Sequence, residues 1–186
     1  MTDRQAPDIV APDLKLLFVG VNPGLRTAVV QAPFANRANR FWRALLGAGI
    51  VDRLIDTHDG LAEADRALLL GRGVGITSLV ERPTARADEV DRAELLSGAR
   101  RLALRVAELK PGAVAVLGVS AFRIAFERPR AALGAQPQSL GGRPLWIVPN
   151  PSGRNAHAPL AKLVATYREV AIAAGIEPLA TTRTTS

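Results

Sequence analysis

The chain has 186 residues, of which 48% are apolar and 22% are charged, a composition typical of one soluble globular domain. It contains no cysteine, which excludes disulfides, thiolate nucleophiles, zinc fingers and iron–sulfur clusters, and its two histidines lie outside any metal-ligand spacing. No apolar run approaches the roughly 20 residues that span a membrane, and the N-terminus has no apolar signal core. We therefore expect no bound metal and no membrane contact.

The net charge of +7 is unevenly distributed along the chain. Residues 14–51 contain five basic side chains and no acid, residues 128–168 contain six and no acid, and the rest of the chain sums to −4. Most of the basic residues are arginines, which can bind phosphate in a bidentate manner. The two blocks predict a surface for a polyanion, although chance clustering on a solvated surface would give the same pattern.

In chain order, we expect residues 1–13 to be a flexible arm and residues 15–20 to be a buried strand, followed by a loop over 22–36. Helical spacing from Phe41 predicts a helix that ends at Gly47–Gly49, with Phe41 and Trp42 in the core. A short helix is predicted over 61–70 and a second buried strand over 74–79. Asp91 and Glu94 resemble a capping box before a long helix that reaches Leu109.

The second half continues the alternation of strands and helices. Strands are predicted over 113–117 and 145–148, with a helix over 118–126 and an irregular loop over 128–142 between them. A last helix begins near Leu160, and residues 176–186 are expected to be a disordered tail. The fold class is therefore α/β: a single three-layer domain over 14–175, with a central, mainly parallel sheet of about four strands and helices on both faces.

Asn22 lies in the turn Gly20-Val21-Asn22-Pro23-Gly24, directly after the first strand. Ligands bind outside the carboxyl ends of strands in open α/β sheets, and an amide can both donate and accept hydrogen bonds. Asn22 could also be only a turn former before proline. The chain has no G-x-G-x-x-G after this strand, no Walker lysine and no Ser/His/Asp arrangement. What remains is an amide, backbone N–H groups, a phenyl ring and arginines, which suits holding a leaving anion and placing a water.

Four ordered motifs resemble those of the mismatch-specific uracil/thymine DNA glycosylases, over roughly residues 14–172. They are Gly20-Val21-Asn22-Pro23-Gly24, then Pro33-Phe34-Ala35 with Ala38-Asn39-Arg40-Phe41-Trp42, then Arg82-Pro83-Thr84, and finally Asn150-Pro151-Ser152-Gly153. The resemblance implies removal of uracil, and in some members thymine or damaged pyrimidines, from double-stranded DNA by base flipping. It implies neither metal nor cofactor.

The resemblance also implies roles for individual residues. Asn22 would orient the hydrolytic water, Phe34 would stack on the flipped pyrimidine, and the 151–156 loop would enter the duplex. The implied substrate contacts are Gly20, Val21, Pro23, Thr27, Phe34 and Asn39, and the implied DNA-binding or wedge residues are Asn150, Pro151, Ser152, Gly153, Arg154 and Asn155. Asp88 is a candidate auxiliary carboxylate or a surface acid, and Asp91 is favoured as a cap rather than a catalytic group.

We accordingly expect a monomeric, monofunctional glycosylase that acts on mismatched uracil in duplex DNA, in the cytoplasm of a bacterium and associated with the nucleoid. Two alternatives from other classes remain: a catalytically inert DNA-binding module and a small-molecule nucleoside hydrolase. Arg154 stands where related proteins carry an apolar wedge, which leaves the preference for the opposite base open. The sequence does not rank uracil, thymine and ethenocytosine, and it does not decide whether single strands are accepted.

Overall fold

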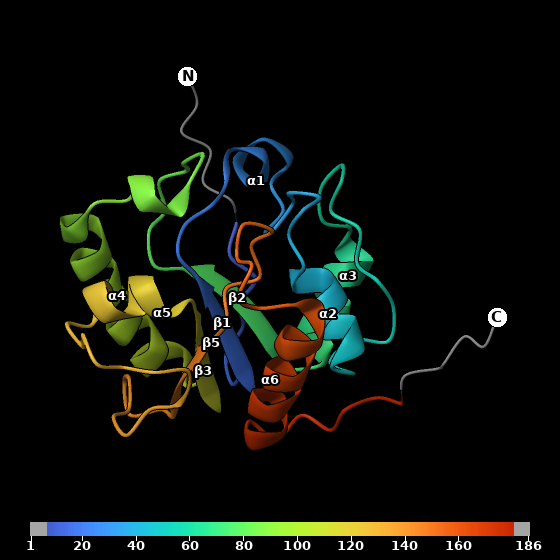
Figure 1. The fold of residues 1–186 in the computed structure, drawn as a ribbon. Helices are drawn as coiled ribbons and strands as arrows, with labels where there is room; N and C mark the ends of the chain where they lie inside the picture. Colours follow the sequence, from blue (N-terminus) through green and yellow to red (C-terminus); the bar gives the residue numbers. More distant parts are fainter. Residues whose placement is uncertain (1–6, 181–186) are drawn as a thin grey trace.

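Five strands form one sheet in the computed structural model, which describes residues 7–180 (Figure 1). In spatial order these are β2 (Val74–Ser78), β1 (Leu16–Gly20), β3 (Ala113–Leu117), β5 (Leu145–Val148) and β4 (Gly134–Ala135). The first four run parallel, and the two-residue β4 pairs antiparallel with β5. The predicted fold class is confirmed, with a short fifth strand added at one edge.

The interior strand β1 shows why this sheet is covered on both faces. All five of its residues are buried. Leu16 and Phe18 belong to one hydrophobic cluster, whereas Leu17 and Val19 belong to the other. Because side chains alternate across a strand, one apolar run supplies two cores, as expected for a parallel sheet between helical layers.

The helices form two layers on opposite sides of the sheet (Figure 1). One layer contains α2 (Phe41–Gly47), α3 (Glu63–Gly71) and α6 (Leu160–Ala173). The other contains α4 (Arg92–Leu109), which begins at the predicted Asp91–Glu94 capping box, and α5 (Val119–Ala125). Phe41 and Trp42 are buried, which confirms their predicted place in the core. None of the helices within residues 7–180 is long and apolar enough to cross a membrane.

Two short helices were not predicted from the sequence. Helix α1 (Leu25–Val30) follows the Asn22 turn and ends at Gln31, whose φ of 56° is left-handed. Its six residues bury only Thr27, so they carry no apolar stripe from which a helix could be predicted. The 3-10 helix η1 (Ala87–Glu89) lies between β2 and α4, and none of its residues is buried.

The described ends of the chain pack against the domain. Ile9 is fully buried and exchanges two hydrogen bonds with Ile76 of the edge strand β2. Ile176 is buried, and the Leu179 amide donates to the Gly49 carbonyl at 2.8 Å. The predictions of a flexible arm and a disordered tail therefore do not hold for residues 7–13 and 176–180, because apolar side chains anchor both segments. The other residues of the arm and the tail lie outside the described part of the chain.

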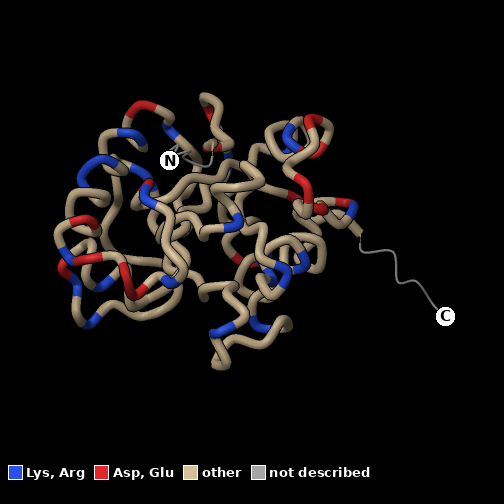
Figure 2. The backbone as a smooth tube through the Cα atoms, turned by 90° about the horizontal axis from the view of Figure 1, so that it is seen from above, with Lys and Arg blue, Asp and Glu red and all other residues tan. Residues whose placement is uncertain are grey.

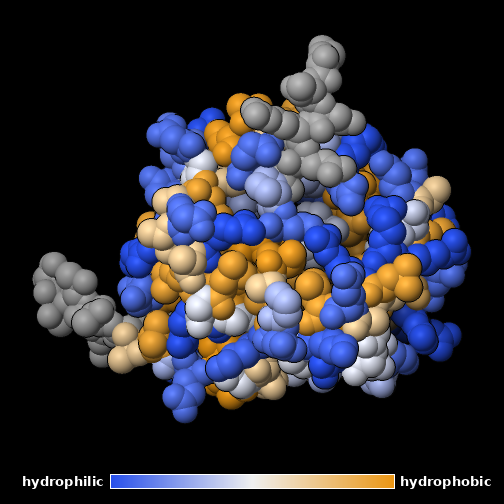
Figure 3. Space-filling view, turned by 180° about the vertical axis from the view of Figure 1, so that it is seen from behind, coloured by the Kyte–Doolittle hydropathy of each residue, from blue (hydrophilic) through white to orange (hydrophobic). Residues whose placement is uncertain are grey.

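Strand order determines which loops meet. Strands β1 and β5 both pair with β3, so the loops that follow them leave the same edge of the sheet with one strand between them. Figure 2 views the molecule from this edge, and its lower border carries Lys and Arg positions without acidic neighbours. On the back of the molecule, by contrast, hydrophobic residues gather in the middle and hydrophilic residues surround them (Figure 3). The loop after Gly20 and the loop after Val148 therefore leave the sheet at the same edge.

Candidate active site

The side-chain amide of Asn22 is held by three acceptors at the carboxyl end of β1. Its nitrogen donates to the Thr84 hydroxyl oxygen at 2.8 Å, to the Arg82 carbonyl at 3.0 Å and to the Pro23 carbonyl at 3.1 Å. The Thr84 amide in turn donates to the Pro23 carbonyl at 3.1 Å. The Arg82-Pro83-Thr84 motif therefore lies beside the Asn22 turn and supports it.

These contacts also determine which end of the amide faces outward. The Thr84 hydroxyl donates its hydrogen to the Arg86 carbonyl, so only its lone pairs are directed at Asn22. All three neighbours of the amide are thus acceptors, and they require the NH₂ group of Asn22 rather than its oxygen. The Asn22 Oδ1 atom accepts no hydrogen bond from residues 7–180 and can accept one from a water.

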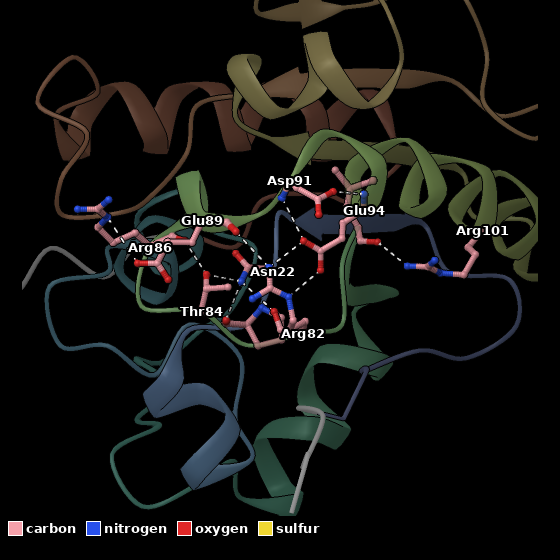
Figure 4. Close-up of polar contacts among 10 residues, drawn as sticks. Asn22, Arg82, Thr84, Arg86, Glu89, Asp91, Glu94 and Arg101 are labelled. Atoms are coloured by element: carbon pink, nitrogen blue, oxygen red, sulfur yellow. Dashed lines mark hydrogen bonds and ion pairs between the residues drawn. The ribbon is translucent and has the colours of Figure 1, made fainter.

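A charged network continues outward from this support (Figure 4). The Arg82 guanidinium binds both carboxylate oxygens of Glu94, at 2.7 and 2.8 Å, and also donates to the Glu89 carbonyl. Glu94 accepts from the Asp91 amide, and Asp91 accepts from the Glu94 amide, which completes the capping box of α4. The hydrogen bond from Arg82 is the main reason that the pKa of Glu94 falls to about 2. The start of α4 is thereby linked to the residue whose carbonyl holds Asn22.

Phe34 lies on a loop that is fixed on both sides of it. Its backbone is left-handed, with φ of 54°, and its ring stacks on Phe41 with 4.0 Å between the ring centroids. The Trp42 indole donates to the Pro33 carbonyl at 3.2 Å, and the Ala35 amide donates to the buried Thr27 hydroxyl at 3.4 Å. Thr27 thus supports the Phe34 loop. Among residues 7–180, its hydroxyl makes no other hydrogen bond.

The Phe34 ring approaches the Asn22 turn at Gly20. A Cβ atom built on Gly20 would lie 3.6 Å from the tip of that ring and 3.6 Å from the Ser78 hydroxyl oxygen. Glycine at this position therefore leaves space between β1, the ring and β2. The carbonyls of Gly20 and Val21, two of the implied substrate contacts, accept hydrogen bonds from the Leu79 and Val80 amides.

A cavity of about 340 Å³ lies on the outer side of the Phe34 loop. Phe34 and Trp42 supply aromatic walls, Asn39 contributes an amide, and loop residues up to His58 close the far side. Asn22 does not line this cavity. Asn39 also has a local role, because its side-chain oxygen accepts from the Phe41 amide at the start of α2.

The loop after β5, here called the insertion loop (residues 150–158), is held by hydrogen bonds between its own residues and by one from α6 to the residue before it. Asn150 accepts from the Ser152 amide at 2.9 Å, and Asn155 donates to the Asn150 carbonyl at 2.9 Å. The Tyr167 hydroxyl donates to the Pro149 carbonyl just before the loop, and burial raises the pKa of that hydroxyl. The Arg154 side chain is exposed, with no ion pair or hydrogen bond to residues 7–180.

The structure thus brings the predicted residues into two groups at one edge of the sheet. Gly20, Val21, Asn22 and Pro23 form the turn beside Phe34, and residues 150–155 belong to the insertion loop. Asp88 joins neither group: its carboxylate is 70% exposed and pairs with Arg86 at 2.9 Å. No three His, Asp or Glu side chains within residues 7–180 gather as possible metal ligands. The supporting role of Thr84 and the contacts of Arg40 were not predicted, because both depend on partners more than 60 residues away.

The fold and the site define a class of protein whose ligand-binding loops gather at the carboxyl edge of a parallel sheet. The family model of the Uracil DNA glycosylase superfamily matches residues 7–171, and the chain belongs to this superfamily. Membership places it among the DNA glycosylases, and the resemblance seen in the motifs is confirmed to that level. A solution NMR structure from Methanosarcina acetivorans, described provisionally as a uracil DNA glycosylase, shares the fold with a TM-score of 0.59. The two sequences are 17% identical, and the match covers 91% of this chain and 99% of the other.

Proposed function

We propose that this protein is a monofunctional, mismatch-specific DNA glycosylase that hydrolyses the N-glycosidic bond of uracil flipped out of double-stranded DNA. The observation that carries the proposal is the fixed amide of Asn22. Its NH₂ group is held by three acceptors, and its oxygen has no partner among the described residues. A pre-oriented acceptor at the edge where the binding loops meet is what positioning a hydrolytic water requires.

The chemistry suits a neutral amide. Breaking the bond leaves a cationic sugar and a pyrimidine anion, and N–H donors that bind the pyrimidine oxygens stabilise this anion. Uracil is then an adequate leaving group without a strong general acid. Asn22 Oδ1 accepts a hydrogen bond from the water and directs a lone pair of the water oxygen toward C1′ of the sugar. As the C1′–O bond forms, the water gives up a proton to solvent and the pyrimidine leaves with the bonding electron pair.

The Phe34 ring is the proposed stacking surface for the flipped base. Extruding a nucleotide costs a few kcal/mol, least for a mismatched pair, and stacking on an aromatic ring returns about 1–3 kcal/mol per base. These two magnitudes are similar, so the strength of the base pair decides how often the base reaches the site. Mismatch selectivity follows from this balance, since a G·U pair opens more readily than an A·U pair.

The insertion loop and its exposed Arg154 are proposed to fill the gap that the extruded base leaves. Residues 128–168 carry six basic side chains and no acid, which favours binding along the phosphate backbone. Among residues 7–180 the side chain of Asn22 hydrogen-bonds to Pro23, Arg82 and Thr84 and to no lysine, whose amine a Schiff-base mechanism would need. We therefore propose a product with an abasic site and an intact strand.

The test is uracil release from a labelled duplex with one G·U pair, detected as alkali-labile strand breaks, beside an A·U duplex and free deoxyuridine. The proposal expects breaks only after alkali, with G·U cleaved faster than A·U and no cleavage of the free nucleoside. An inert DNA-binding module would bind the duplex without any breaks. A nucleoside hydrolase would cleave deoxyuridine and ignore the duplex. Breaks without alkali treatment would contradict the monofunctional assignment.

A further inference from the structure

Arg40 makes an unusual set of contacts at the junction between the Phe34 segment and the insertion loop. Its guanidinium donates to the Ser152 and Ala158 carbonyls at 2.6 Å each, to the Asn155 carbonyl at 3.0 Å and to the Pro151 carbonyl at 3.4 Å. Its backbone amide also donates to the Pro151 carbonyl, at 3.0 Å. One side chain therefore contacts four of the nine residues of the loop.

The chemistry of these partners distinguishes Arg40 from a phosphate-binding arginine. All four side-chain acceptors are backbone carbonyls of a single loop, and no carboxylate within residues 7–180 pairs with the guanidinium. A guanidinium carries five N–H donors in a rigid planar fork, and this shape lets it satisfy several carbonyls at once. The half-buried charge is used inside the protein, where it fixes the shape of the loop.

The same segment also positions the proposed base-stacking ring. Arg40 is followed directly by Phe41, on which the Phe34 ring stacks. A Cβ atom built on Gly153 would lie 2.7 Å from the Ala38 carbonyl oxygen, so the loop rests against this segment by close backbone approach as well. Any movement of Arg40 would displace the insertion loop relative to the ring.

We propose that Arg40 is a positioning residue that presets the insertion loop for entry into the duplex while Phe34 receives the extruded base. The inference rests on the proposed function, in which that loop replaces the extruded base. A preset loop lowers the ordering cost of insertion, and this gain applies only when a stacked and paired base must be displaced. Arg40 therefore sets how strongly the rate depends on base pairing, and it does not take part in bond cleavage.

The experiment compares single-turnover uracil release from three substrates: an A·U duplex, a G·U duplex and a duplex with uracil opposite an abasic site. Loss of charge-assisted hydrogen bonds in Arg40→Ala is expected to slow the paired substrates about tenfold relative to uracil opposite the abasic site. The relative loss should be largest for A·U. Arg40→Lys keeps the charge but not the planar fork of donors. Its rate on the paired substrates, relative to uracil opposite the abasic site, should lie between those of Arg40→Ala and the wild type.

Arg72 offers a matched control. Its guanidinium also binds backbone carbonyls, those of Ile50 at 2.9 Å and Glu177 at 2.6 Å, away from the insertion loop. Arg72→Ala should lower stability in a similar way and leave the ratio between the three substrates unchanged. A fall of equal size on all three substrates in Arg40→Ala, or the same pattern in Arg72→Ala, would overturn the proposal.

A second measurement does not depend on activity. Arg154 is an exposed trypsin site within the insertion loop. Limited trypsin digestion should cut after Arg154 several-fold faster in Arg40→Ala than in the wild type or Arg72→Ala. Unchanged cutting would refute the positioning role even if the protein releases no uracil. Faster cutting in a protein that releases no uracil would leave the loop contact standing and remove the proposed function instead.

Discussion

Thr84→Val tests whether the Arg82-Pro83-Thr84 motif acts through Asn22. The Thr84 hydroxyl is the nearest acceptor of the Asn22 amide, at 2.8 Å, and the residue is only 4% exposed. Valine keeps the branched shape but removes this acceptor and also the donor to the Arg86 carbonyl. The amide retains two carbonyl acceptors, at Arg82 and Pro23, so it stays in place but rotates more freely.

The expected magnitude follows from the number of bonds lost. One neutral hydrogen bond contributes about 1 kcal/mol net, which corresponds to roughly a fivefold slower chemical step if the bond serves only to orient the amide. The Arg86 carbonyl loses one donor but keeps the Glu89 amide, at 3.2 Å, so the second lost bond adds only about 1 kcal/mol to the loss of unfolding free energy. Thr84→Val should therefore be measurably less stable and moderately slower.

The assay is single-turnover release of uracil from a G·U duplex with protein in excess, together with duplex affinity and a thermal unfolding curve. Thr84→Ser is the control, because it keeps the hydroxyl and should retain the wild-type rate. The reasoning is refuted if Thr84→Val cleaves at the wild-type rate while its unfolding free energy falls, or if the serine variant loses as much rate as the valine variant.

Three further predictions concern the ring, the insertion loop and the α4 network. Phe34→Leu removes the ring that stacks on Phe41 and should slow single-turnover cleavage about tenfold, since base stacking contributes about 1–3 kcal/mol; an unchanged rate would exclude stacking. Arg154→Ala should weaken binding to the uracil-containing duplex, because the side chain proposed to fill the gap left by the extruded base is lost, and equal affinity of the variant and the wild type would exclude that role. Because Arg82 lowers the folded pKa of Glu94 to about 2, below the usual value near 4.5, the Glu94 carboxylate stabilises the fold above pH 4.5 and loses this effect as the pH falls toward 2. Glu94→Gln should therefore lower the melting temperature at pH 7 and leave it close to that of the wild type near pH 2; a constant difference would contradict this linkage.

The order of strands and helices could be predicted from the sequence because the periodic signals were strong. Apolar runs such as Ala113–Leu117 identify buried strands, and Asp91 with Glu94 identifies the start of α4. Helix α1 and strand β4 were missed because six and two residues carry too short a pattern. The buried Ile9 was missed because the short apolar run Ile9-Val10-Ala11 lies in a proline-containing segment and gives no sign of its partner strand.

The residues of the candidate site could be predicted from the sequence, but the hydrogen bonds that join them could not. The Gly-Val-Asn-Pro-Gly turn and the Asn-Pro-Ser-Gly loop follow parallel strands, so their meeting at one edge follows from topology. The acceptors that orient Asn22 and the carbonyls that surround Arg40 come from distant segments, and only the folded backbone brings them together. Asp88 illustrates the reverse, since an acid near a motif in sequence pairs instead with its neighbour Arg86.

The most direct measurement is the single-turnover rate of uracil release from a G·U duplex by Asn22→Ala, with circular dichroism as the check on folding. If the carbonyl oxygen of this amide holds the attacking water, the folded variant should release uracil at least about a hundredfold more slowly than the wild type, in the range typical for loss of a group that positions or activates a reactant. Release at the wild-type rate by a folded Asn22→Ala protein would contradict the account.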